Sequence, residues 1–245
     1  MIYRADLHIH TVLSPCGDLE MTPRNIVEAA KKRGLHIIGI TDHNSTLQCA
    51  EVKKVGEREG LYVLCGVELN TREEVHALAF FETSQQLSEF QIFLDKHLPH
   101  VKNNVDKFGY QLVINEEEEV LQEMPYLLFV ALTAGIEEIE AEVHRLDGIF
   151  IPAHINRMQN SVLSQLGFLP PDLKVDALEL SRHVTIPAFL EKNKYLSKYP
   201  FIQSSDAHIV EDIGAIYTEL KMDEISFENI RLALSVKRTS SSAST

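Results

Sequence analysis

The sequence predicts an α/β protein with a mainly parallel sheet, on three observations. Short apolar runs of strand length alternate with helical stretches, which is typical of repeated β-α units. Hydrophobic residues make up 44% and charged residues 24% of the chain, the balance of a folded protein rather than a disordered one. With 245 residues the chain is long enough to bury its own core. This pattern does not decide whether the sheet is open or closed into a barrel.

The first third of the chain predicts strands and helices in alternation. Thr22 is expected to cap a helix that begins at Pro23, because proline fits the first helical position. Ser45 with Gln48 matches a capping box, which predicts a second helix that runs to Gly60. Strands are expected at residues 3–10, 37–41, 62–67 and 75–81.

The middle of the chain, about residues 84–146, predicts a mostly helical insertion rich in Glu, Gln and Lys. Its acidic run Glu116–Glu119 is expected to be a solvated helix face. Residues 1–238 are expected to form a single domain, and the Ser-, Thr- and Ala-only tail over 239–245 is expected to be disordered. After the insertion, strands are expected at 148–152, 177–180, 201–204 and 215–220, and helices at 186–196 and 227–234.

Charge and cysteine content narrow the classes of function. Asp and Glu number 36 against 23 Lys and Arg, so the net charge is −13. Such a surface repels polyphosphate chains, which argues against long nucleic acid as a partner. Three widely spaced cysteines without a CxxC pair argue against a disulfide framework. The absence of a signal-peptide pattern and of any apolar run near about 20 residues predicts a cytoplasmic protein without membrane contact.

Imidazole and carboxylate side chains recur where the predicted strands end. In the run from Asp6 to His10, the strand period of two places His8 and His10 on one face, where both rings can reach one metal ion. The carboxyl ends of parallel strands gather at one face, so residues far apart in sequence meet there. The other strand-end residues are His43, Glu68, His154, Asp206 and His208.

A cluster of this composition predicts bound divalent metal. Crowded imidazoles and carboxylates are costly to desolvate without a cation, and their donor atoms suit Zn²⁺, Mn²⁺ or Fe²⁺. A catalytic ion needs only three or four protein ligands, so the candidates exceed the needs of one ion. Two or three divalent ions are therefore expected.

Four segments of the chain resemble the four motifs of the PHP (polymerase and histidinol phosphatase) superfamily, and they occur in the same order. The resemblance covers about residues 1–82 and 147–235 and leaves the insertion outside. It implies a distorted (β/α)7 barrel with a metal cluster at its C-terminal face, and hydrolysis of phosphoesters by metal-activated water. The segments are Asp6-Leu7-His8-Ile9-His10-Thr11, Thr41-Asp42-His43-Asn44, Ala153-His154 and Ser205-Asp206-Ala207-His208.

The resemblance also implies roles for single residues. Glu68 matches a carboxylate that bridges two metals, and His76 looks like the further ligand that follows it. In the loop after the first segment, Asp18 is favoured as a ligand because a hard carboxylate suits Mn²⁺ or Fe²⁺, and Cys16 is its rival. The implied ligands are His8, His10, Asp18, His43, Glu68, His76, His154, Asp206 and His208, of which Glu68, Asp206 and His208 are also expected to be catalytic.

Three further residues are candidates for substrate contact. Arg157 and Arg182 lie just beyond predicted strands, and an arginine there either holds a phosphate with two parallel hydrogen bonds or pairs with a surface acid. Asn44 directly follows a ligand, and it either orients its loop, which is favoured, or touches substrate.

The favoured function is a metal-dependent phosphoesterase that acts on a small phosphorylated substrate, either a phosphomonoester or a nucleotide phosphodiester. Net charge and the lack of a polymerase region favour this over a DNA-end exonuclease, and an insertion lying over the metal face would restrict access further. A histidinol phosphatase is a further alternative. A non-catalytic metal-binding regulatory module, from another class, is opposed by the intact ligand set.

Overall fold

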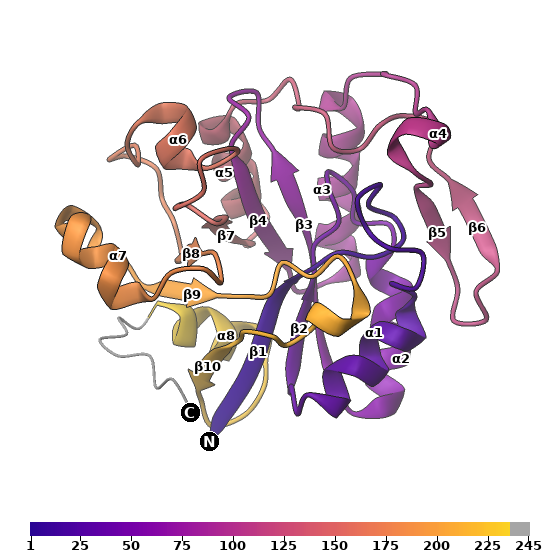
Figure 1. Cartoon of the computed structure of the whole chain (residues 1–245), viewed down its shortest axis with the longest axis horizontal. Coiled ribbons are helices and arrows are strands. Elements are labelled where there is room, and N and C mark those ends of the chain that lie inside the picture. The colour runs from indigo at the N-terminus through magenta and orange to yellow at the C-terminus, as the bar shows by residue number, and fades with distance from the viewer. Residues whose placement is uncertain (236–245) are drawn as a thin grey trace.

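The computed structural model describes residues 1–235, so the predicted tail over 239–245 lies outside the described residues. A curled six-stranded sheet forms its centre (Figure 1). In spatial order its strands are β10 (Thr218–Lys221), β1 (Ile2–Ile9), β2 (Ile37–Ile40), β3 (Tyr62–Asn70), β4 (His76–Phe81) and β7 (Ile149–Pro152).

Two further strands continue this sheet toward a barrel. β8 (Leu178–Leu180) and β9 (Phe201–Gln203) form a parallel pair, and β8 contacts β7. The chain that follows β9 returns to β1, because Ala207 pairs with Ile9 and its carbonyl accepts a hydrogen bond from the His10 N–H at 3.0 Å. The predicted distorted barrel is confirmed.

The sheet is less parallel than the sequence predicts. β1–β2 and β2–β3 are parallel, whereas β1–β10, β3–β4 and β4–β7 are antiparallel. Only residues 71–75 connect β3 to β4, and a parallel crossover needs a dozen residues or more. The reversal brings the start of β4 to the edge where β2 and β3 end.

The first two helices differ in how well their starts are predicted. α1 (Pro23–Lys32) begins as expected, since the Thr22 hydroxyl accepts a hydrogen bond from the N–H two residues after Pro23. α2 (Cys49–Glu59) begins only at Cys49, so the capping box expected at Ser45 is wrong. The side-chain amide of Gln48 instead forms two hydrogen bonds with the backbone of Ile114, at 2.8 and 2.9 Å, and is not free to cap.

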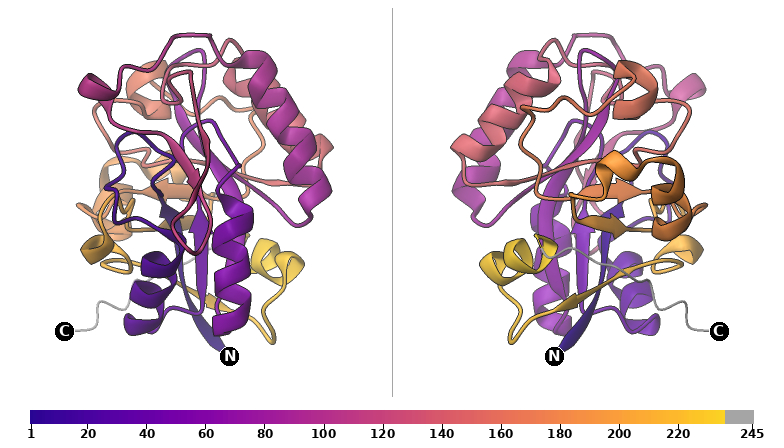
Figure 2. Two further views of the ribbon diagram at one scale, coloured as in Figure 1. Left: turned by 90° about the vertical axis from the view of Figure 1, so that its right-hand side faces the viewer. Right: turned by 90° about the vertical axis from the view of Figure 1, so that its left-hand side faces the viewer.

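The insertion contains a hairpin as well as helices. β5 (Leu112–Ile114) and β6 (Val120–Glu123) pair antiparallel, and the run Glu116–Glu119 lies in the connection between them. The expectation of a helix face for this run is therefore wrong. Figure 2 shows α3 and α5 side by side along one side of the molecule. The helices after α2 are α3 (Ser84–His97), α4 (Val105–Phe108), α5 (Ile136–Arg145), α6 (Val162–Leu166), α7 (Ile186–Lys192) and α8 (Phe227–Leu234).

Apolar clusters on both sides of the sheet fix the strands that carry the site. On β1, Leu7 and Ile9 are fully buried in two such clusters. The position between them holds His8, and His10 directly follows the strand; both are equally buried but polar. Within residues 1–235, no helix combines the length and the apolar character needed to cross a membrane.

Candidate metal centre

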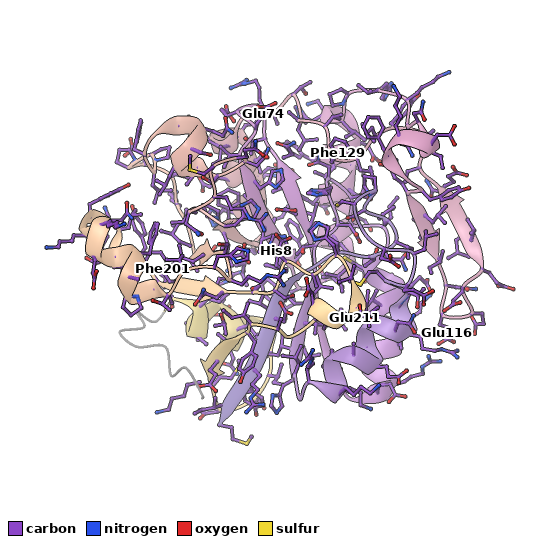
Figure 3. The ribbon with its side chains drawn as sticks, viewed as in Figure 1. His8, Glu74, Glu116, Phe129, Phe201 and Glu211 are labelled. Carbon is purple, nitrogen blue, oxygen red and sulfur yellow. The ribbon has the colours of Figure 1, made fainter. Side chains whose placement is uncertain are left out.

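Glu68, a buried residue of β3, lies at the centre of the site. Its carboxylate lies within 3.4 Å of nitrogens from five imidazoles that come from four different parts of the chain. His8, at the end of β1, lies near the middle of the molecule in Figure 3. The distances to Glu68 oxygens are 2.9 Å for His76 Nδ1, 3.0 Å for His154 Nε2, 3.2 Å for His10 Nε2, 3.2 Å for His43 Nδ1 and 3.4 Å for His8 Nε2.

Antiparallel pairing explains why His76 belongs to this group. His76 is the first residue of β4, and the start of an antiparallel strand lies at the edge where its neighbours end. His154 follows β7, which runs antiparallel to β4, so it reaches the same edge. His154 and Asp206 have φ angles of +29° and +54°, conformations that side-chain-bearing residues adopt rarely and that concentrate at functional sites.

Glu179, which the sequence analysis missed, orients two of the histidines. Its Oε2 lies 3.0 Å from Nδ1 of His8 and also accepts a hydrogen bond from the backbone N–H of His154 at 3.0 Å. A proton held on Nδ1 leaves Nε2 of His8 with its lone pair directed at the cluster, which is the usual way a carboxylate prepares a histidine ligand. In the sequence, Glu179 is marked only as a single acidic residue between two apolar ones on the predicted strand before Ser181.

Asp42 and Ser14 hold His10 in a similar way. Nδ1 of His10 lies 2.9 Å from the Ser14 hydroxyl, which donates a hydrogen bond to the Asp42 carboxylate at 2.6 Å. Asp42 also accepts the backbone N–H of Thr11 at 2.8 Å. Asp42 belongs to one of the four sequence motifs, but the sequence does not indicate that it supports the loop after β1.

Asp206 completes the inner part of the site. Its Oδ1 lies 3.3 Å from Nε2 of His8 and 3.4 Å from Nε2 of His10, and its other oxygen pairs with the guanidinium of Arg157. His208 Nδ1 lies 2.8 Å from the backbone carbonyl of Asp206, and its ring stacks on that of His10 with centroids 4.2 Å apart.

Electrostatics keep the central carboxylate ionised. Burial alone would raise the pKa of Glu68, but electrostatic attraction by the neighbouring histidines, chiefly His76 and His8, holds that pKa well below its ordinary value. Burial would also raise the pKa of Asp206, and His8 and His10 lower it far below normal. Both side chains are therefore anionic oxygen donors at neutral pH.

The histidines fall into two electrostatic classes. Burial lowers the pKa of His43 well below its ordinary value and that of His208 to about 4, so both rings are neutral and have a free lone pair. For His10, burial lowers the pKa, but hydrogen bonds to Asp206 and Glu68 outweigh it and raise the pKa to about 9. A cation that binds there replaces the proton on His10.

The donor set fits divalent metal. Nδ1 of His43 and Nδ1 of His154 are buried without a hydrogen-bond partner, and buried polar atoms of this kind call for an unseen ligand. Ligand atoms approach to within 4.8 Å of one another in three groups: His8, His10 and Glu68; His43, Glu68 and His76; and His10, Cys16, His43 and His208. Imidazole, carboxylate and thiolate donors at this density suit Zn²⁺ and other borderline ions.

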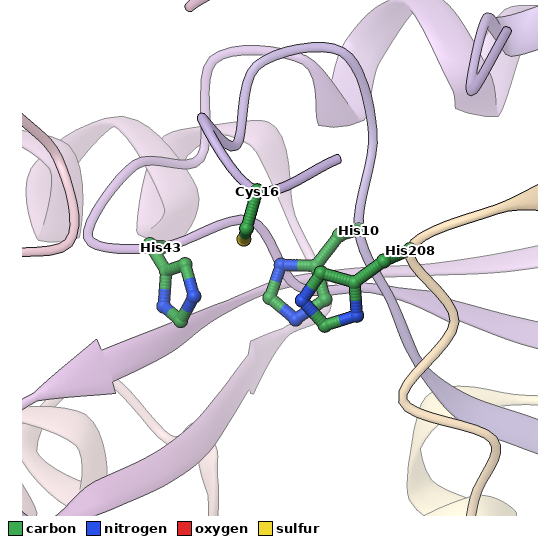
Figure 4. Close-up of side chains that lie close together, drawn as sticks. All are labelled: His10, Cys16, His43 and His208. Atoms are coloured by element: carbon green, nitrogen blue, oxygen red, sulfur yellow. The ribbon is translucent and has the colours of Figure 1, made fainter. Parts of the chain in front are cut away.

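The third group contains Cys16 and not Asp18 (Figure 4). The Asp18 carboxylate accepts a hydrogen bond from the backbone N–H of Glu20 at 2.8 Å. The structure therefore brings together every ligand expected from the sequence except Asp18, in whose place the rival Cys16 lies beside the histidines.

The three expected substrate contacts differ in position. Arg157 lines a cavity of about 300 Å³ together with His76 and His154. Arg182 pairs with Asp212 at 2.9 Å. Asn44 is buried, and its amide donates to the carbonyls of Leu128 and Val130 and accepts the N–H of Asn70, so it orients its loop instead of facing a substrate.

A barrel that gathers histidines and carboxylates around one glutamate is typical of a class of protein, the metal-dependent hydrolases of barrel fold. Within that class, the chain belongs to the PHP domain family, which matches residues 6–162, and a PHP-associated segment matches residues 196–239. The resemblance seen in the sequence motifs is confirmed.

Individual relatives extend the likeness over nearly the whole chain. The Bacillus subtilis (strain 168) protein YqxK is 26% identical over 94% of this chain and 61% of its own length. Endonuclease Q of Pyrococcus furiosus, a lesion-specific enzyme, has a similar fold with a TM-score of 0.71 and 24% identity, over 96% of this chain and 56% of its own. A candidate metal-dependent phosphoesterase of Bifidobacterium adolescentis has a similar fold with a TM-score of 0.62 and 20% identity, over 94% of this chain and 95% of its own. The chain thus spans less than two thirds of YqxK and of endonuclease Q.

One of these structural neighbours acts on long nucleic acid, which the sequence disfavours as a partner of this chain. Endonuclease Q has been seen in complex with a 27-mer duplex that carries an abasic lesion at the active site. A net charge of −13 averages over the whole surface, whereas Arg157 and a metal cluster would make one small region positive.

Proposed function

We propose that this chain hydrolyses the phosphoester bond of a small phosphorylated substrate, a phosphomonoester or a nucleotide phosphodiester, at a cluster of two or three divalent ions. The observation that carries the proposal is the position of Glu68, one buried carboxylate with two oxygens surrounded by five imidazoles. One divalent ion cannot bind so many donor atoms, so the number of donors calls for more than one ion. Zn²⁺, Mn²⁺ and Fe²⁺ all suit this set.

Each ligand has a place in this proposal. His8, His76 and His154 lie nearest to Oε1 of Glu68, and His10 and His43 lie nearest to its Oε2. Asp206 lies beside His8 and His10. Glu68 would share in holding more than one ion, together with these residues. Bound divalent ions lower the pKa of a coordinated water and neutralise charge that builds on phosphoryl oxygens.

Arg157 would position the substrate phosphate. It lies on the wall of the cavity of about 300 Å³, beside His76 and His154, and contacts Asp206. An arginine can hold two phosphate oxygens at once. A cavity of this size lies at the lower end of the range for small-molecule sites, which favours a small substrate.

The insertion would restrict the approach to the site. The carbonyls of Leu128 and Val130 accept hydrogen bonds from Asn44, and Phe129 O accepts the side-chain amide of Asn70 at 2.8 Å. This part of the insertion is thus tied to the loop that follows His43 and to the end of β3, the strand that carries Glu68.

The test is a side-by-side assay with Mn²⁺ or Zn²⁺. Its substrates are p-nitrophenyl phosphate, its bis ester, mononucleotides and single-stranded DNA, and Glu68→Gln is the control for activity of this site. Small esters should turn over faster than long DNA. Faster degradation of DNA than of every small ester would reverse the ranking. Bound metal without turnover of any substrate would favour the regulatory module.

A lesion-specific DNA endonuclease is the second candidate, because the likeness to endonuclease Q covers 96% of the chain. To test this candidate, the same assay includes a duplex with one abasic site and the same duplex without the lesion. Cleavage confined to the abasic duplex, with no turnover of small esters, would establish this candidate and overturn the first.

A further inference from the structure

The loop after β1 folds back over His10, the residue that directly follows this strand. Its backbone makes two successive turns, with Ser14 N–H donating to Thr11 O at 3.1 Å and Gly17 N–H donating to Ser14 O at 2.9 Å. A Cβ atom at Gly17 would lie 2.3 Å from Thr11 O, so only glycine permits the second turn. The loop is therefore held in a defined shape around Cys16.

The same loop is tied to the segment after β9. The backbone N–H of Asp18 donates to the carbonyl of His208 at 2.8 Å. As a result Sγ of Cys16 and one nitrogen each of His10, His43 and His208 all lie within 4.8 Å of one another, and Figure 4 shows the thiol between the rings of His43 and His10.

Two of these histidines keep a nitrogen that makes no hydrogen bond. Nδ1 of His43 is buried without a hydrogen-bond partner, although it lies 3.2 Å from Oε2 of Glu68, and the residue is only 7% exposed. His208 places Nδ1 against the carbonyl of Asp206, which leaves Nε2 with a free lone pair. His10 is different, because both of its nitrogens are engaged, Nδ1 by Ser14 and Nε2 by Glu68 at 3.2 Å.

We propose that Cys16, with His43 and His208, binds an outer metal ion of the cluster through its thiolate, and that this sulfur donor makes the outer position select Zn²⁺ or Co²⁺ over Mn²⁺ and Mg²⁺. The inference rests on the proposed function only in that the cluster holds divalent ions. On binding, the thiol loses its proton to solvent and a metal–sulfur bond forms, with no change of oxidation state.

The selectivity follows from the donor atoms. Thiolate is a soft ligand that suits Zn²⁺, while carboxylate and water suit Mn²⁺ and Mg²⁺. Three protein ligands leave one position of a four-coordinate ion open, as in catalytic zinc sites. Asp18 at this place would give the opposite preference, but its carboxylate accepts the Glu20 N–H instead.

Titration of the metal-free protein with Co²⁺ tests the thiolate directly. Wild type should develop a sulfur-to-cobalt charge-transfer absorption in the near ultraviolet, together with visible bands from cobalt held by the other ligands. Cys16→Ser should lose the charge-transfer absorption and keep the visible bands. Asp18→Asn, two residues away, is the matched control and should keep both.

The outcomes separate this inference from the proposed function. Visible cobalt bands without charge-transfer absorption in wild type would overturn thiolate binding and leave the metal cluster standing. Charge-transfer absorption that survives in Cys16→Ser would assign the sulfur to another cysteine and also overturn it. No cobalt bound in any form would instead contradict the proposed function.

Thiol labelling of wild type gives a second readout that needs no variant. Cys16 is exposed, whereas Cys49 and Cys65 are buried, so an alkylating reagent should reach Cys16 first in the folded protein, although desolvation and the Glu68 carboxylate raise the pKa of its thiol and slow the reaction. Zn²⁺ should protect the metal-free protein from labelling, and Mn²⁺ at the same concentration should not. Equal labelling with and without Zn²⁺, or equal protection by Mn²⁺, would contradict the selective thiolate site.

Discussion

Glu179 and His8 form a buried pair in which Oε2 of the carboxylate lies 3.0 Å from Nδ1 of the imidazole. The same oxygen accepts the backbone N–H of His154, so one side chain fixes the positions of two candidate metal ligands. The pair also controls which nitrogen of His8 carries the proton, and hence whether Nε2 can bind a metal at all.

Glu179→Gln should weaken metal binding without unfolding the chain. If the amide oxygen keeps the hydrogen bond from His154, the NH2 group faces Nδ1 of His8 and shifts its proton to Nε2, which removes the lone pair. We expect the dissociation constant for Zn²⁺ to rise about 10- to 100-fold, measured by competition with a chelator. Glu219→Gln, an exposed glutamate, is the control. Equal affinity in both variants would show that Glu179 does not act through His8.

Sequence reasoning finds the ligands more easily than the residues that hold them. Strand-end histidines stand out because their polarity interrupts apolar runs, as at His43 and His154. Glu179 lies inside a short strand, where one acid between two leucines is also the pattern of an ordinary half-exposed strand. Its partner is 171 residues away, and only the closed barrel brings the two together.

Glu68→Gln tests the centre of the cluster. The substitution keeps the size of the side chain and removes the charge that would offset two adjacent dications. We expect lower metal occupancy and a fall in turnover of at least about a hundredfold. Elemental analysis and steady-state rates with the preferred small ester measure the two effects. Near-normal values of both would place Glu68 outside the functional cluster.

The direction of β4 shows a second limit of structure prediction from the sequence. His76 was matched to the family by resemblance, while the β-α pattern alone predicted a mainly parallel sheet. The short connection over 71–75 makes β4 antiparallel, and this reversal is what carries His76 to the cluster. Similarly, Ser45 and Gln48 have the spacing of a capping box, but Gln48 is already bonded to Ile114, a partner that lies 66 residues away.

Arg157 should matter for substrate binding and Arg182 should not. Arg157→Ala removes the guanidinium from the cavity wall, so KM for a phosphomonoester should rise at least about tenfold, the loss expected for one charged hydrogen-bond pair. Arg157→Lys should recover only part of this, because lysine cannot hold two oxygens in a fixed fork. Arg182→Ala is the comparison, since Arg182 pairs with Asp212. A larger effect from Arg182→Ala would exchange the two roles.

His144 links stability to pH at a place remote from the ligands. A hydrogen bond with Asp176 raises its pKa above the ordinary value, and Glu140 adds to this against the effect of burial. A raised pKa in the folded state means that the stabilisation is complete below the unfolded pKa of about 6.5 and is lost as pH rises through the folded pKa. His144→Gln should therefore lower the free energy of unfolding by up to about 1 kcal/mol at pH 6 and less at pH 9. Urea denaturation at both values measures the difference, and a cost that grows with pH would contradict it.

Metal removal should destabilise the whole fold, because the cluster buries its donors whether or not cations are present. His8 and His10 are fully buried and Glu68 is 1% exposed, so without cations their desolvation is offset only by one another. One ion at about 100 times its dissociation constant stabilises the native state by about 2.7 kcal/mol, which for a chain of this size is a shift in Tm of about 5 to 10 °C for each site filled. Chelation should lower Tm by at least the amount for one site, and addition of Zn²⁺ or Mn²⁺ should restore it with two or three ions bound per chain by elemental analysis. Glu68→Gln should show a smaller shift, because its cluster holds the ions less tightly. A Tm that is the same with and without chelator, with less than one ion per chain after reloading, would mean that these side chains do not form a metal centre.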